Sequence, residues 1–382
     1  MGPFLLFTLH ESCFSGIEVQ TFQRMLKMIR KLFLFTLPAL GVLIGSWSTF
    51  ALSWLPENER TFQSIRLPQA MEWLSQNRLT IQPVVVAVID SGINLLHPNV
   101  PLFLKTNPLE INGNQLDDDF NGYRDDYFGF DFLKQSSILT DGNGHGTHVA
   151  GIIHQANPNA KVLVLKVLDT DGNGSSSAVI QAIEYAVKSG AKVINLSLGA
   201  ADQLSQMKEG YEKIIRLARQ NNILVLAAAG NDSSNNDQTP VFPANTWEDN
   251  IMAICSNNID GRLSSFSNYA LNRVHLCAPG ENLLSYNAAY TPAKSANPIG
   301  NNLLIYMSGT SQATPLVSAV ASILYGLAPN LKPYQVRDLL MGYSSRSISL
   351  IGASQSAGVL NAEASIKGLF SKPLPLLPRI DR

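Results

Sequence analysis

The sequence is poor in cysteine and in charge. Three cysteines among 382 residues exclude a small scaffold held together by many disulfides. Charged residues make up 15% of the chain and the formal net charge is −1, so there is no basic footprint for nucleic acid and we expect no such partner. No repeat is evident along the chain. Apolar residues, at 45%, suffice for the core of one large domain.

The N-terminal region has the pattern of an export signal. Arg30 and Lys31 precede an uncharged stretch over 32–56, and Thr49 and Ala51 are small residues at the positions that a signal peptidase reads. A retained membrane anchor is the alternative. We therefore expect 1–24 to lie outside the true protein or to be disordered, 25–51 to be a signal peptide, 52–83 a short N-terminal extension, 84–368 the main domain and 369–382 a Pro-rich tail.

After residue 83 the chain alternates between apolar strands and helices. A helix expected at 178–189 precedes a strand at 192–198, and a helix at 206–221 precedes another strand that ends at Asn231. Such alternation predicts an α/β fold, with a parallel sheet covered by helices on both faces.

Three short blocks carry candidate catalytic residues. Asp90 ends an apolar run typical of a buried parallel strand, His145 lies where a glycine-rich segment leads into a helix, and Ser311 opens a helix of small residues. Taken singly, the aspartate suits a turn and the serine suits a helix N-cap. Together, Asp, His and Ser are the parts of an activated nucleophile. His148, three residues after His145, has no Cys or Glu nearby in a zinc pattern.

The three blocks resemble the signature blocks of the subtilisin-like serine proteases (subtilases), and their order along the chain is the same. The resemblance covers about 84–368, and it implies a three-layer αβα fold with a central, mostly parallel sheet. It implies a secreted serine endopeptidase that forms an acyl-enzyme, with Ser311 as nucleophile, His145 as base and Asp90 supporting the imidazolium. In the family pattern His148 is then structural.

The resemblance also implies an oxyanion donor and a peptide cleft. Asn231 follows an apolar strand and is similar to the family's side-chain donor to the oxyanion. An extended peptide would be read mainly through its backbone, and the small wall residues predict a preference for medium or large apolar side chains. The expected substrate walls are Ser197, Leu198 and Gly199 on one side, Gly172 and Gly174 opposite, and Ala228 and Gly230 in the pocket.

An acidic loop between the Asp and His blocks has the rhythm of a calcium loop. Oxygen side chains recur at positions 1, 3, 5 and 9, with glycine at position 6, but position 12 is Phe128, so the loop is not an EF-hand. A solvated acidic turn is the alternative. Similar insertions in other subtilases often bind Ca²⁺, which implies a structural Ca²⁺ here. The expected ligands are Asp117, Asp119, Asn121 and Asp125, with Tyr123 through its carbonyl.

Three further features bear on stability, maturation and resistance to oxidation. Cys255 and Cys277 lie in two apolar strands, where an export signal permits a disulfide and two buried free thiols are the alternative. The extension at 52–83 is too short to form the core of a separate folding-assistant domain. Gln312 follows Ser311 where subtilisins commonly have methionine, which predicts resistance to oxidation.

The expected biology follows from these features. We expect a secreted or periplasmic monomer that acts on proteins or peptides, with no stable membrane partner unless the signal is retained as an anchor. An esterase with the same triad and an inactive subtilase-fold binding or scaffold protein are the rival functions. The presence of Asp90, His145, Ser311 and Asn231 argues against the inactive scaffold.

Overall fold

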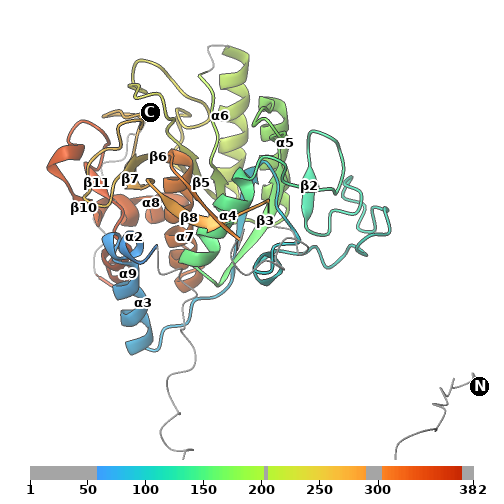
Figure 1. Cartoon of the computed structure of the whole chain (residues 1–382), viewed down its shortest axis with the longest axis horizontal. Coiled ribbons are helices and arrows are strands. Elements are labelled where there is room, and N and C mark those ends of the chain that lie inside the picture. The colour runs from blue at the N-terminus through green and yellow to red at the C-terminus, as the bar shows by residue number, and fades with distance from the viewer. Residues whose placement is uncertain (1–57, 202–204, 290–302, 372–382) are drawn as a thin grey trace, which may run out of the picture. The chain divides into compact units, whose positions relative to one another are not determined.

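A nine-stranded sheet forms the centre of the described part of the chain, residues 58–201, 205–289 and 303–371 of a computed structural model (Figure 1). The strand order is β10-β11-β7-β6-β5-β4-β1-β3-β2, and every neighbouring pair is parallel except β10 with β11. The strands are β1 (Val84–Asp90), β2 (Gly129–Asp131), β3 (Ala160–Lys166), β4 (Val193–Leu196), β5 (Leu224–Ala228), β6 (Ile251–Asn257), β7 (Leu276–Pro279), β10 (Ser345–Arg346) and β11 (Gly358–Val359). The expected α/β fold with a mostly parallel sheet is confirmed.

Helices cover this sheet, and a second sheet of two antiparallel strands, β8 (Leu283–Tyr286) and β9 (Leu304–Met307), packs near α4. Every residue of β5 and β6 is buried, because a sheet that is covered on both faces leaves no strand surface to water. The helices are α2 (Glu59–Ser64), α3 (Leu67–Gln76), α4 (His145–Ala156), α5 (Ser176–Lys188), α6 (Ser205–Gln220), α7 (Thr310–Leu327), α8 (Pro333–Gly342) and α9 (Ala362–Leu369), with short 3₁₀ turns at Val100–Leu102 and Ile348–Leu350.

The strand order reverses direction beside β1. From β1 the chain runs to β2 at the edge of the sheet and returns through α4 to β3, which lies between β1 and β2. From β3 it crosses through α5 to β4 on the other side of β1. α7 packs against α4, and α6 packs against α5. A reversal of this kind opens a crevice at the carboxyl ends of the strands, where α/β proteins place their sites.

The stretch before β1 is an integral part of this unit. α3 packs on α9, and Trp73 contacts Phe370 with ring centroids 5.4 Å apart. The buried Asn58 side chain accepts a hydrogen bond from Leu284 N–H at 3.0 Å and donates to Leu284 O at 2.6 Å and to Gln155 Oε1 at 3.0 Å. The described part of the extension therefore joins β8 and α4 and does not form a separate segment.

Cys255 on β6 and Cys277 on β7 form a disulfide, so the alternative of free thiols does not apply to this structure. The two residues are directly paired across the strands, with Cα atoms 4.4 Å apart, and both are fully buried. The expected segments 1–24 and 25–51, and all but the first three residues of the tail at 369–382, lie outside the described residues. Within the described ranges, no helix is long and apolar enough to cross a bilayer.

Candidate active site

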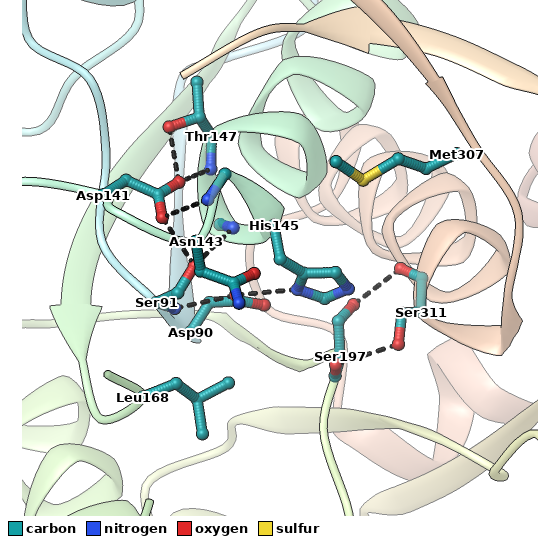
Figure 2. A network of polar contacts seen from close by, with 12 residues as sticks. Asp90, Ser91, Asp141, Asn143, His145, Thr147, Leu168, Ser197, Met307 and Ser311 are labelled. Atoms are coloured by element: carbon teal, nitrogen blue, oxygen red, sulfur yellow. Dashed lines mark hydrogen bonds and ion pairs between the residues drawn. The ribbon is translucent and has the colours of Figure 1, made fainter. Parts of the chain in front are cut away.

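Asp90 and His145 meet at the carboxyl end of β1. Asp90 is the last residue of that strand and is fully buried, while His145 is the first residue of α4. Asp90 Oδ1 lies 2.8 Å from His145 Nδ1 and also accepts the Ser91 N–H at 2.7 Å. Since a carboxylate only accepts, the hydrogen bond places the proton on Nδ1 and leaves Nε2 facing the other side of the site (Figure 2).

Asp141 holds the beginning of the His145 helix, a role that sequence reasoning missed. Its Oδ1 accepts from Gly144 N–H at 2.7 Å, and its Oδ2 accepts from Thr147 N–H at 2.8 Å and Thr147 Oγ1 at 2.7 Å (Figure 2). Ser91 Oγ donates to the same carboxylate at 2.8 Å. A carboxylate at this end satisfies free N–H groups and opposes the helix dipole favourably. The sequence feature that could have revealed this role is the position of Asp141, four residues before His145.

Two glycines allow β1 and α4 to approach closely. Gly92 has φ of +115°, and a Cβ there would lie 2.4 Å from Leu139 O. A Cβ on Gly146 would lie 2.4 Å from Gly92 O. Any larger residue at 146 would therefore push the helix away from Asp90 and lengthen the Asp90–His145 hydrogen bond.

The two histidines of α4 have opposite electrostatic environments. Burial opposes a charge on His145, but the charge and hydrogen bond of Asp90, with a further contribution from Asp141, outweigh it and raise the pKa of His145. Burial lowers the pKa of His148 to about 4, and the neighbouring His145 adds to this effect. His148 Nε2 lies 3.1 Å from Leu283 O and 3.1 Å from Ile305 O, so it donates to carbonyls that tie α4 to β8 and β9. These contacts fit a structural role for His148.

Ser311 lies at the second position of α7 and faces His145 across the site (Figure 2). Its Oγ donates to Ser197 O at 3.0 Å, and Ser197 Oγ donates to Ser311 O at 2.8 Å. Among the described residues, the hydroxyl therefore binds this carbonyl and makes no hydrogen bond to His145. Catalytic hydrogen bonds often form only when substrate is bound.

Pro315 explains why the Ser197 hydroxyl donates to the Ser311 carbonyl. It is the sixth residue of α7 and lies beyond the first turn, because the helix begins at Thr310. A proline has no N–H, so the carbonyl four residues earlier, that of Ser311, loses its helical donor. The Ser197 hydroxyl fills that position at 2.8 Å. The pair therefore joins the Ser311 backbone to the end of β4.

Asn231 lies beside the N-terminus of α7 with its amide oriented by Thr310. Asn231 Oδ1 accepts from Thr310 N–H at 2.9 Å and from Thr310 Oγ1 at 3.1 Å. Because the oxygen is held there, Nδ2 and its two protons are directed away from Thr310. Ser311 N–H is among the first N–H groups of the helix, which have no intrahelical acceptor. The arrangement offers two donors near the Ser311 hydroxyl.

The expected substrate walls all emerge at the same edge of the sheet. Ser197, Leu198 and Gly199 follow β4, and Ala228 and Gly230 lie at the end of β5. These strands are paired in parallel, so their carboxyl ends lie side by side. Gly172 and Gly174 are exposed in the loop after β3, where Leu168 and Gly174 form an isolated bridge.

A methionine reaches the site from a strand that precedes Ser311. Met307 ends β9, and its Sδ lies 4.0 Å from Gln312 Nε2. It stands near Ser311 and His145 in Figure 2. Gln312 itself is not oxidisable, but the thioether of Met307 lies beside it. The structure therefore favours sensitivity to oxidation in place of the resistance expected from Gln312.

The acidic loop forms a cluster with a membership different from the sequence expectation. Carboxylate oxygens of Glu110, Asp119 and Asp126 lie within 4.8 Å of one another. Glu110 is buried, its Oε1 accepts two backbone N–H groups, and its Oε2 has no partner among the described residues. A buried cluster with an unpaired carboxylate oxygen can hold a metal ion.

The other expected ligands bind the loop's own backbone and amides. Asp117 accepts from the N–H groups of Asn121 and Gly122, at 3.0 and 2.9 Å. Asp125 accepts from backbone N–H groups of the preceding segment. Asn121 Nδ2 donates to Asp119 and Asp126 at 3.2 and 2.8 Å, and Tyr123 packs its ring edge-on to Tyr185. Of the five expected ligands, Asp119 thus belongs to the cluster and Asn121 donates hydrogen bonds to it.

The fold, with an acid, an imidazole and a hydroxyl at the carboxyl edge of a parallel sheet, is that of a serine protease of the subtilisin class. The model of the subtilase family matches residues 82–361. Subtilisin DY of Bacillus licheniformis is 32% identical over 249 residues, which cover 62% of this chain and 82% of that protein. An alkaline protease of Alkalihalobacillus alcalophilus is 30% identical over 355 residues, covering 87% of this chain and 80% of that protein.

Solved structures agree with this assignment. A cold-adapted subtilisin-like serine proteinase matches with a TM-score of 0.57 and 25% identity, covering 73% of this chain and 88% of that one. The chain belongs to the subtilase family, and it is a serine-type endopeptidase.

Proposed function

We propose that Ser311, His145 and Asp90 carry out the hydrolysis of peptide bonds. Ser311 Oγ attacks the peptide carbonyl carbon as its proton passes to His145 Nε2, and Asp90 stabilises the resulting imidazolium through Nδ1. His145 then gives that proton to the leaving amine, and water cleaves the acyl-enzyme by the same route. The 2.8 Å contact between Asp90 Oδ1 and His145 Nδ1 is the observation that carries this proposal.

The oxyanion of the tetrahedral intermediate would accept from Asn231 Nδ2 and Ser311 N–H. The hydrogen bonds of Asn231 Oδ1 to Thr310 support this assignment, because they leave both amide protons available. Removing such a side-chain donor costs about 10²–10³ in kcat.

A serine-directed fluorophosphonate tests the nucleophile. The wild-type enzyme should become labelled on the peptide that contains Ser311, and Ser311→Ala should lose both labelling and proteolysis. Ser308→Ala is the matched control, because Ser308 is an exposed serine three residues away that accepts from Asn282 N–H. Labelling that persists in folded Ser311→Ala would refute the assignment. Turnover of esters without peptides would favour the esterase, and no labelling of the wild type would favour the scaffold.

We further propose that an extended peptide binds between the loop after β3 and the segment after β4. Exposed Gly172 and Gly174 lie on one side and Ser197–Gly199 on the other, and the small Ala228 and Gly230 leave room for an apolar side chain. A peptide library cut by the purified enzyme should show a preference for medium or large apolar residues before the cleaved bond. A preference for acidic or basic residues there would contradict this.

The acidic cluster is proposed as a structural Ca²⁺ site. Glu110, Asp119 and Asp126 would hold the ion, Asn121 lies against it, and the backbone bonds of Asp117 and Asp125, with the packing of Tyr123, shape the loop. Burial, together with the charges of Asp126 and Asp119, raises the pKa of Glu110 against the effect of its backbone donors, and a cation would relieve that repulsion.

Calorimetric titration and melting of inhibited enzyme test the calcium proposal. Ca²⁺ at a hundredfold excess over Kd should add about 2.7 kcal/mol of stability. Asp119→Asn should reduce this gain, whereas Asp260→Asn, at an exposed acid elsewhere, should retain it. Equal Ca²⁺-dependent shifts in wild type and Asp119→Asn would identify a solvated acidic turn.

We propose that the protein acts outside the cytoplasm as a monomer. The buried disulfide between Cys255 and Cys277 supports an oxidising compartment. Expression of the full chain in a bacterial host, followed by fractionation and N-terminal sequencing, tests export. A mature N-terminus near Leu52 in the soluble extracytoplasmic fraction is expected, while an intact chain in the membrane fraction would identify a retained anchor. Sedimentation of Ser311→Ala tests the monomer.

A further inference from the structure

Asn268 lies directly behind the strand end that carries Asn231. It is fully buried, in the segment between β6 and β7. Its Nδ2 donates to Ala229 O at 3.1 Å, and its backbone N–H donates to Gly230 O at 3.0 Å. Both carbonyls that precede Asn231 are therefore held by one residue.

The same side chain holds the chain after Asn231. Asn268 Oδ1 accepts from Asp232 N–H at 2.8 Å and from Ser234 N–H at 3.0 Å. Asn231 is thus bracketed, because the carbonyls before it and the N–H groups after it bind a single side chain and its backbone. Alanine at 268 would keep the backbone bond to Gly230 O but would leave three backbone groups around Asn231 without this side-chain partner.

Gly230 and Asn268 fit each other sterically. Gly230 has φ of +110°, and a Cβ built there would lie 2.4 Å from Asn268 Nδ2. The amide therefore occupies the space that any other side chain at 230 would need. This close fit fixes the direction in which the chain leaves β5, and with it the position of the Asn231 Cα.

Further buried amides hold Asn268 in turn. Its Nδ2 also donates to Asn236 Oδ1 at 3.1 Å, and Asn236 Nδ2 donates to Ala229 O at 2.8 Å. Asn245 Nδ2 donates to Asn236 O at 2.7 Å. With two bonds donated and two accepted, the Asn268 amide has no unused hydrogen-bonding position, so it cannot turn without breaking several bonds.

We propose that Asn268 is a positioning residue for the oxyanion donor. Asn268 fixes the backbone of Asn231, Thr310 fixes its side-chain oxygen, and the two together aim Asn231 Nδ2 at the developing oxyanion. The inference rests on the proposed role of Asn231. A donor of this kind acts only when it is held at 2.7–3.1 Å from the oxyanion before the reaction begins. Its displacement should therefore lower kcat and spare KM, since the bound substrate depends little on it.

The test is a double-mutant cycle between Asn268→Ala and Asn231→Ala, with active sites counted by fluorophosphonate titration. On a peptide p-nitroanilide, Asn268→Ala should lower kcat about 10- to 100-fold, with KM within about twofold of wild type. In the Asn231→Ala background, Asn268→Ala should change kcat by less than about twofold, because the donor that it positions is already absent. Asn250→Ala is the matched control, since Asn250 is equally buried and donates to Ile215 O and Ile223 O far from the site.

The outcomes separate this inference from the proposed function. Wild-type kcat in Asn231→Ala would refute the role of Asn231 itself. A large loss in Asn231→Ala, combined with a loss from Asn268→Ala that multiplies in the double variant, would refute the positioning role alone. An unchanged kcat in Asn268→Ala, or a loss of equal size in Asn250→Ala, would refute it too. If Asn268→Ala does not fold, Asn268→Ser takes its place in the cycle under the same criteria.

Discussion

His154 should make the folded protein sensitive to acid. It is 6% exposed on α4, its ring stacks on Phe103 with centroids 4.5 Å apart, and its Nδ1 lies 2.7 Å from Tyr286 Oη. Burial, with a smaller contribution from the charge of Lys161, lowers the pKa of His154 from 6.5 to about 4. Protonation puts a hydrogen on both ring nitrogens, so the Tyr286 hydroxyl could then only accept from Nδ1 and no longer donate to it.

The sign and size of the effect follow from the two pKa values. Between pH 6.5 and about 4, His154 is protonated in the unfolded chain but neutral in the folded protein. The free energy of unfolding therefore falls as the pH falls. Above pH 6.5, His154 is neutral in both states, and the folded protein keeps its full stability. A difference of this size corresponds to about 2–3 kcal/mol lost between pH 7.5 and pH 4.5. That is a large share of the stability of a typical domain.

Urea unfolding followed by tryptophan fluorescence measures this loss, in a Ser311→Ala background that prevents autolysis. His154→Gln lowers stability at both pH values, but its loss between pH 7.5 and 4.5 should be smaller than that of the parent by about 2–3 kcal/mol. Tyr286→Phe is the control: it removes the hydrogen bond and keeps the burial, so the acid loss should persist. Equal acid losses in the parent and in His154→Gln would refute the reasoning.

Three further outcomes are expected. Although burial opposes a charge on His145, Asp90 raises the pKa of His145, so kcat/KM should fall as the pH drops through a midpoint above 6.5. A midpoint below 6.5 in the pH–rate profile would contradict this. Ser197→Ala should lower the free energy of unfolding by about 1 kcal/mol. The loss should be smaller in a Pro315→Ala background, because a helical N–H can again donate to the Ser311 carbonyl. Urea titrations that show equal losses in both backgrounds would exclude this role of the Ser197 hydroxyl. Peroxide should inactivate the wild type, and Met307→Leu should protect it; equal inactivation rates would place the sensitive group elsewhere.

Local patterns were enough to predict the candidate site residues. Asp90 follows an apolar strand, and Ser311 opens an apolar helix, so the hydrophobic pattern alone indicated where each lies in the fold. The alternation of strands and helices likewise predicted the parallel sheet. The acidic loop was also visible in the sequence, but its backbone bonds turn Asp117 and Asp125 to the loop itself, and the cluster includes Glu110 and Asp126 instead.

The sequence by itself determined the family and the sheet and supplied the candidate reactive groups, because these depend on short-range patterns of burial and on residue types within single blocks. Only the tertiary structure decided which distant groups meet: Ser197 with the Ser311 carbonyl, and Asn268 with the backbone around Asn231. The physical reason is that each of these contacts joins two separate segments, whose approach is set by the packing of the whole core and leaves no periodicity in either one.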